Sequence, residues 1–160
     1  MHIVIVNRWP RFRDGRRWDN ELTRYEDFFD HQQHRISYVV DALGADGVLA
    51  PAQHIAHQVQ VDDVNQYEQL LGAVQEVIER VGPVDQLIAL SEFTLEIAAR
   101  VRQTLNIPGH GPDEVAVYRD KARMKEILQN QGLPVPPFAR CESVQQAVDF
   151  AREIGFPLIV

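Results

Sequence analysis

The chain has 160 residues and a net charge of −7, with 45% apolar and 24% charged residues. These proportions are typical of folded globular proteins and exclude a chain that is disordered throughout. The length suits one domain, or one domain and part of another. The acidic balance disfavours nucleic-acid binding through the whole surface.

Two features bear on where the protein works. A single cysteine, Cys141, excludes an internal disulfide and a zinc site built from cysteines. No apolar run reaches the roughly 18 residues that a membrane span requires, and the first residues lack the regions of a signal peptide. We therefore expect a cytoplasmic protein with no membrane partner.

The first half of the chain predicts strands and helices that alternate. Apolar, β-branched runs predict buried strands at His2–Val6, Arg35–Val40 and Gln86–Leu90. Apolar residues at helical spacing predict amphipathic helices over Asn65–Val81 and Phe93–Leu105. This alternation predicts an α/β fold with an open, mostly parallel, Rossmann-like sheet. In such sheets ligands bind outside the carboxyl ends of the strands.

The segment Arg8–Trp18 mixes arginine with tryptophan and predicts an irregular loop that leads into a short helix near Glu21–His31. No glycine-rich turn follows the first strand, so the dinucleotide-binding fingerprint is absent. Arginine and aromatic side chains can stack on bases, but the net charge opposes a nucleic-acid partner. We expect the segment to cover the sheet edge or to close over an anionic ligand.

The second half of the chain predicts a further series of elements. A connection is expected at Pro112–Val117, a helix at Tyr118–Gln131 and a short strand at Phe138–Cys141. A second helix, Val144–Ile154, opens with a capping box of Ser143 and Gln146, and another strand begins at Pro157–Val160. We divide the chain into domains at 1–112 and 113–160. Because chain ends are usually polar, the apolar end Leu158–Val160 predicts a protein that continues beyond this sequence.

Three small motifs favour structural explanations. His31 and His34, and likewise His54 and His57, have a spacing that could bind a metal on a helix, but no third ligand is apparent and we assign no metal site. Gly109-His110-Gly111 lies between prolines and favours a loop over a phosphate cradle. No catalytic triad or carboxylate pair can be read from the spacing, so the catalytic residues stay unknown.

Candidate ligand contacts come from Arg8, Glu92 and the two lysines. Arg8 and Glu92 follow the first strand and the strand at Gln86–Leu90, where ligands bind; Glu92 could equally be a helix residue stabilised by the helix dipole. Of the 16 basic residues, 14 are arginine, and the only lysines, Lys121 and Lys125, lie in one short segment. A lysine in such a chain can mark a place where a compact charge is needed.

The last third of the chain carries several motifs in a fixed order: Ile107-Pro108-Gly109, Asp120-Lys121, Met124-Lys125, Gly132-Leu133-Pro134-Val135-Pro136 and Gly155-Phe156-Pro157-Leu158-Ile159-Val160. Their order and gaps resemble the junction between the pre-ATP-grasp domain and the ATP-grasp fold in the ATP-grasp superfamily. The resemblance covers Asp85–Val160, including Ser91-Glu92, and extends to Met1–Val84 only in architecture.

The resemblance implies the N-terminal part of an ATP-dependent carboxylate–amine ligase, which works through an acyl phosphate and could join amino acids. Lys121 matches the lysine that contacts nucleotide phosphate from a helix start, whereas Lys125 is expected at the surface. ATP and Mg²⁺ are the implied cofactors of the complete enzyme. The implied partners are ATP, a small carboxylate and an amine acceptor, and the apolar C-terminal residues could pair two copies as a homodimer.

The family's second nucleotide lysine, its glycine-rich lid and its metal-binding carboxylates lie beyond Val160, so we expect this chain alone to be inactive. Two alternatives stay open. One is an ATP-grasp carboxylase or a carbamoyl-phosphate-type subunit, which this stretch of sequence does not separate from an amino-acid ligase. The other is a non-catalytic α/β binding or interaction module.

Overall fold

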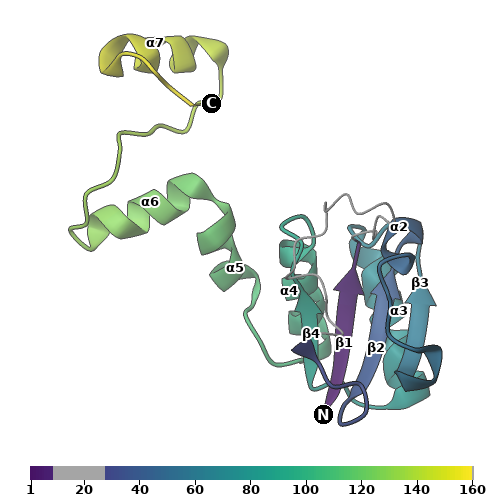
Figure 1. The fold of residues 1–160 in the computed structure, drawn as a ribbon. Coiled ribbons are helices and arrows are strands. Elements are labelled where there is room, and N and C mark those ends of the chain that lie inside the picture. The colour runs from purple at the N-terminus through teal and green to yellow at the C-terminus, as the bar shows by residue number, and fades with distance from the viewer. Residues whose placement is uncertain (9–27, 160) are drawn as a thin grey trace. The chain divides into compact units, whose positions relative to one another are not determined.

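The computed structural model describes residues 1–8 and 28–159 (Figure 1). The chain divides into two units, Met1–Val115 and Ala116–Val160. The domain boundary that the sequence places after residue 112 stays a prediction. Most of the segment Arg8–Trp18 and of the helix expected near Glu21–His31 lies outside the described residues; within the described part, residues 31–33 form a turn.

The first unit is built on a sheet of four strands that all run parallel (Figure 1). The strands are β1 (His2–Asn7), β2 (Arg35–Val40), β3 (Ile55–Gln60) and β4 (Gln86–Ala89), in the spatial order β3-β2-β1-β4. This confirms the predicted α/β class and its parallel sheet. The sequence did not indicate β3, because this edge strand alternates half-buried with exposed residues and has no apolar run.

Two amphipathic helices cover one face of the sheet, as predicted. These are α3 (Tyr67–Val81) and α4 (Leu95–Leu105). Their buried residues form one core with the side chains that β1, β2 and β4 turn to this face: Val4, Val6, Val39, Leu87 and Ala89 meet Leu70, Val74, Val77, Ala98 and Val101. The opposite face carries a second cluster around Ile5, Ile36 and Tyr38. Because β1 is buried along its whole length, both faces depend on it.

A buried arginine secures the end of the first unit. Arg102 of α4 is 9% exposed, and its guanidinium donates to the carbonyl of Leu87 at 3.0 Å and to that of His110 at 3.0 and 3.1 Å. Burial lowers the pKa of this group below its usual value. Gly109, with φ +136°, lies so close that a Cβ there would be 2.9 Å from Arg102 Cδ. The structure therefore shows Gly109-His110-Gly111 as a loop fastened to α4.

The histidine pairs do not lie on helices. His31 and His34 lie in the turn and bend before β2, and His54 ends a short 3-10 helix, Ala52–His54, while His57 lies in β3. Spacing that would align two side chains on a helix therefore does not align either pair here. His57 instead makes a 2.9 Å contact with Glu76.

The helices after residue 111 differ from the predicted ones. The stretch Pro112–Val117, expected to be a connection, belongs to the helix α5 (Pro112–Arg119). Proline is tolerated at the start of a helix, because the first N–H groups of a helix make no hydrogen bond within it. Acidic residues in the first turn stabilise the helix through its dipole. The helix expected over Tyr118–Gln131 is interrupted at Asp120, which caps a separate helix, α6 (Lys121–Asn130).

The last helix begins and ends where the sequence indicates. In α7 (Val144–Ile154), the Ser143 hydroxyl accepts from the backbone of Gln146 at 3.2 Å, and the Gln146 side chain accepts from the backbone of Glu142 at 2.7 Å. No strand forms at Phe138–Cys141, where one was expected. Of the strand expected from Pro157 onward, the described residues 157–159 also form none. A strand requires a neighbour, and the described residues of the second unit contain none.

The second unit has little interior of its own. No described residue from Ala116 to Ile159 is buried, and α7 leaves Val144, Val148 and Ile154 on an exposed apolar face. About 45 residues are too few to enclose a core, so this agrees with the limit set by chain length. Among the described residues, no helix is long and apolar enough to span a membrane.

The contact between Gly44 and the end of β1 can be tested by mutation. The short helix α2 (Ala42–Ala45) approaches β1 so closely that a Cβ on Gly44 would lie 2.0 Å from the backbone oxygen of Asn7. We expect Gly44→Ala to destabilise the protein by about 1–3 kcal/mol, because neither backbone can move easily.

The matched control is Gly72→Ala on the exposed side of α3, where the added Cβ would meet no atom within 4 Å apart from its chain neighbours and the backbone of its own helix. It should stabilise the protein by about 0.5–1 kcal/mol through helix propensity. Urea unfolding of both variants measures the difference, and equal effects would contradict the proposed close contact.

Candidate functional site

The strand order creates a switch point between β1 and β4. The chain passes from β1 to β2 and β3 on one side and then crosses to β4 on the other side of β1. Since all four strands are parallel, their carboxyl ends share one edge of the sheet. In open α/β sheets, the crevice at such a switch point is where ligands bind. The residues that follow β1 and β4 are therefore the first place to look for a site.

The loops after these two strands touch. The guanidinium carbon of Arg8, directly after β1, lies 4.8 Å from the centre of the Phe93 ring, in the turn after β4. Arg8 is half-buried, and Glu92 is exposed beside Phe93. The structure thus places both candidate substrate residues at one edge. Glu92 lies in the turn between β4 and α4 and precedes the first helical residue, Leu95.

Two buried polar residues also lie at this edge; from the sequence, Asn7 was not a candidate, and Ser91 was named only within the family resemblance. Asn7 is 1% exposed, and its side chain donates to the carbonyl of Gly44 at 2.8 Å, which holds α2 against the end of β1. Ser91 is 3% exposed, and its hydroxyl has no hydrogen-bond partner within the described part of the chain. Leaving a buried hydroxyl unpaired costs about 1–3 kcal/mol, so Ser91 has an unsatisfied hydrogen-bonding group at this edge. Position at a strand end was the signal that could have identified both.

A further carboxylate contributes to the charge at this edge. Asp63, in the loop after β3, accepts from the backbone and the side chain of Asn65, each at 2.8 Å. The backbone bond is the main reason that its pKa lies below the usual value, and the positive charge of Arg8 acts in the same direction. Asp63 is therefore ionised at neutral pH, and its negative charge interacts electrostatically with Arg8.

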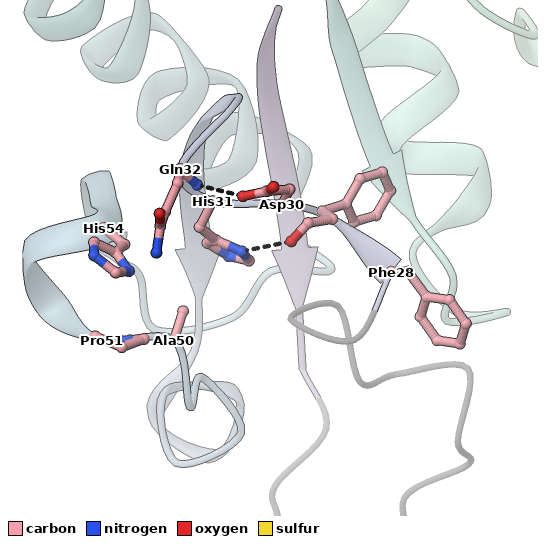
Figure 2. A pocket seen from close by; sticks show the side chains of 8 residues that line it. Phe28, Asp30, His31, Gln32, Ala50, Pro51 and His54 are labelled. Carbon is pink, nitrogen blue, oxygen red and sulfur yellow. Dashed lines mark hydrogen bonds between the residues drawn. The ribbon is translucent and has the colours of Figure 1, made fainter.

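A cavity lies elsewhere, beside the segments that lead into β2 and β3. It has a volume of about 450 Å³, and Figure 2 shows the residues that line it, among them His31, Gln32 and His54. His31 donates from Nδ1 to the carbonyl of Phe29 at 2.8 Å, and its Nε2 lies 2.8 Å from the Tyr38 hydroxyl. Both ring nitrogens are thus engaged by the protein, so His31 is not placed to bind a metal.

In the second unit, the two lysines of α6 have different surroundings. Lys121 is its first residue, is exposed, and has no hydrogen bond or ion pair with another described residue. Lys125 lies one turn later with its Nζ 5.2 Å from the Phe138 ring, a cation–π contact. The charge of Lys121 is thus available to a ligand, whereas that of Lys125 already faces an aromatic ring.

The carboxylate before Lys121 is held from two sides. Asp120 Oδ1 accepts from the backbone N–H groups of Ala122 and Arg123, each at 3.0 Å, and Oδ2 accepts from Arg140 Nη2 at 2.6 Å. The bond from Arg123 and that from Arg140 lower the pKa of Asp120. Sequence reasoning missed Arg140, because nothing local signals a contact across 20 positions.

No protein-family model matches the chain. Its curated relatives include the L-arginine-specific L-amino acid ligase of Bacillus subtilis, 27% identical over 65% of this chain and 25% of the relative. They also include the chloroplastic biotin carboxylase of Arabidopsis thaliana, 36% identical over 44% of this chain and 14% of the relative. The carbamoyl phosphate synthase large chain of Xylella fastidiosa is 29% identical over 54% of this chain and 8% of the relative.

Solved structures share the fold over nearly the whole chain. An L-amino acid ligase from Bacillus licheniformis has a TM-score of 0.66 at 17% identity, covering 91% of this chain and 34% of the other. A phosphoribosylglycinamide synthetase from Anaerococcus prevotii has a TM-score of 0.63 at 11% identity, covering 98% of this chain and 35% of the other. The chain spans a quarter or less of the length of the curated relatives described here.

The cap on α6 should weaken in acid. A carboxyl whose pKa is lower in the folded state stabilises that state above its unfolded pKa, about 3.9, and this contribution is lost as the pH falls through the folded value. We therefore expect the backbone amides of Ala122 and Arg123 to lose protection from exchange only below the ordinary range of an aspartate. Asp120→Asn keeps a capping oxygen but cannot titrate, so its amides should lack this pH step. A step that persists in Asp120→Asn would contradict the assignment.

Proposed function

We propose that this chain, a member of the ATP-grasp superfamily, is the N-terminal part of an ATP-dependent carboxylate–amine ligase. Lys121 carries the proposal. It is a lysine at the first position of a helix, exposed and unpaired among the described residues, and it occupies the place that the family resemblance gives to a phosphate contact.

The proposed chemistry explains why such a lysine is needed. A carboxylate is a poor electrophile, and phosphorylation by ATP converts it into an acyl phosphate that an amine can attack. The transferring phosphoryl group is stabilised by positive charges placed around it. An exposed ammonium on a helix start supplies one such charge. In this proposal Lys121 binds and orients the nucleotide phosphates.

The edge between β1 and β4 is the proposed substrate-facing surface. It offers a cation in Arg8, a carboxylate in Glu92 and a buried hydroxyl in Ser91. A small substrate that carries both a carboxylate and an ammonium could be recognised by the first two groups. This favours an amino acid, in agreement with the similarity to two L-amino acid ligases.

The second candidate function is an ATP-grasp carboxylase or a carbamoyl-phosphate-type subunit. It is favoured by the similarity to a biotin carboxylase and to carbamoyl phosphate synthases. A non-catalytic module of the same fold is the third. An ATP-dependent ligase that requires an amino acid and an amine differs from both in its products.

The residues that the structure describes do not form a magnesium site. Within residues 1–8 and 28–159, no group of three or more histidine, cysteine, aspartate or glutamate side chains could hold a metal ion. We therefore assign Mg²⁺ no ligand in this chain and propose that the remainder of an ATP-grasp domain completes the site. That remainder would also cover the apolar face of α7. A homodimer through this region stays a prediction.

The 160-residue chain should not hydrolyse ATP on its own. Phosphoryl transfer needs positioned phosphates and metal together, and Lys121 is the one cation of this chain that we assign to the phosphates. ADP release is measured with Mg²⁺ and an amino-acid mixture, for the chain and for the complete enzyme. Sustained release by the chain alone would contradict the proposal that it is only part of the site.

In the complete enzyme, Lys121→Ala should raise the KM for ATP about tenfold or more, because a charged contact to phosphate is lost. Lys121→Arg should rescue this only in part, since a planar guanidinium does not replace a compact ammonium. Lys125→Ala is the matched control, because Lys125 faces Phe138. Equal sensitivity to the loss of either lysine would show that the site is wrongly assigned.

Glu92→Gln tests the substrate edge separately. It removes one charge and keeps the size, so the KM for the amino-acid substrate should rise while the KM for ATP stays within about twofold. Glu96→Gln, on the first turn of α4, is the control for a general change of surface charge. If the two variants behave alike, Glu92 has no specific role.

A further inference from the structure

A carboxylate next to the proposed phosphate-binding lysine poses an electrostatic problem. Asp120 directly precedes Lys121 and is needed there, because its oxygen satisfies two backbone N–H groups of the first turn of α6. As an anion it also repels the phosphates of ATP and offsets the charge of Lys121. Neutralising this negative charge without loss of the cap would strengthen the attraction of phosphates to the start of α6.

Arg140 is placed to do this. Its Nη2 donates to Asp120 Oδ2 at 2.6 Å, so one carboxylate oxygen caps the helix while the other meets the guanidinium. The Nε of Arg140 lies 3.7 Å from Glu126 Oε1, further along α6. The guanidinium thus faces both acidic side chains that α6 and its cap present on this side. Negative charge near Lys121 is compensated by a residue 19 positions later in the chain.

Arg140 is itself held in place by its surroundings. It lies at the end of the extended segment after α6, and Phe138 of that segment packs under the ammonium of Lys125 at 5.2 Å. Two contacts, one through Phe138 and one through Arg140, therefore attach the same short segment to α6. An isolated surface ion pair contributes little, but a pair whose arginine is attached at a second point loses less freedom when it forms.

We propose that Arg140 is a positioning residue for the nucleotide phosphates, one that neutralises Asp120 so that the start of α6 presents the net positive charge of Lys121. This inference rests on the proposed role of Lys121. Arg140 acts through Asp120 and is not assigned a contact with the nucleotide. The alternative is that Arg140 only tethers its segment to α6, and the two roles predict opposite results for a double variant.

The test is a titration of the 160-residue chain with Mg²⁺-ATP, followed by the backbone amide resonances of α6. Arg140→Ala should weaken ATP binding about three- to tenfold, because the charge of Asp120 is no longer compensated. Adding Asp120→Asn in the same chain should restore the affinity to within about twofold of the original, since asparagine caps a helix without a charge. The ATP affinity of Arg140→Lys should fall between that of the original chain and that of Arg140→Ala.

Arg152→Ala is the matched control. Arg152 is an exposed arginine of the same unit that pairs with Asp149 on α7 at 3.3 Å, so its loss removes the same charge from a different place. It should leave ATP affinity unchanged. The helical chemical shifts of α6, measured in every variant without ATP, report whether the helix stays formed.

The outcomes separate this inference from the proposed function. If Lys121→Ala leaves ATP binding intact, the phosphate site is wrong and the inference falls with it. If Lys121→Ala weakens binding but Arg140→Ala matches Arg152→Ala, only the role of Arg140 is overturned. If Arg140→Ala weakens binding and Asp120→Asn fails to restore it while α6 stays helical, Arg140 is a tether and charge compensation is rejected.

Discussion

The first unit depends on one constraint, the burial of a central parallel strand. β1 pairs with β2 on one side and β4 on the other, and every residue from His2 to Asn7 is buried. Parallel pairing places all carboxyl ends on one edge, and the reversal of strand order at β1 brings the loop after β4 to the loop after β1. The contact of Arg8 with Phe93 follows from that topology, and so does the location of the proposed substrate surface.

The second unit is organised on a different principle. With no buried residue between Ala116 and Ile159, its helices are defined by caps and ion pairs instead of by a core. The Asp120 carboxylate caps the start of α6, and its ion pair with Arg140 attaches the following extended segment to α6. Such an arrangement can orient a single charged side chain. Its exposed apolar face on α7 supports the proposal that a larger ATP-grasp domain completes it.

The sequence predicts an element well when the pattern that defines it lies within the element's own residues, and poorly when it depends on distant residues. The apolar runs and periods of β1, β4, α3 and α4 are contained within each element, and these elements form as expected. β3 was missed because an edge strand needs only half of its residues covered. α5 was missed although Pro112 and the acidic residues after it mark a helix start. The pairing of Arg140 with Asp120 has no local signal, because it depends on the path of the extended segment between them.

We propose that the complete protein activates a carboxylate by phosphorylation. The direct measurement uses amino acids whose carboxylates carry a heavy oxygen isotope, supplied with ATP and Mg²⁺ to the complete enzyme. The carboxylate oxygen attacks the terminal phosphorus and ADP leaves; the amine then displaces phosphate from the acyl carbon. The released phosphate should therefore contain one labelled oxygen, and ADP should contain none. Phosphate without label, formed together with a new amide bond, would contradict the acyl-phosphate route.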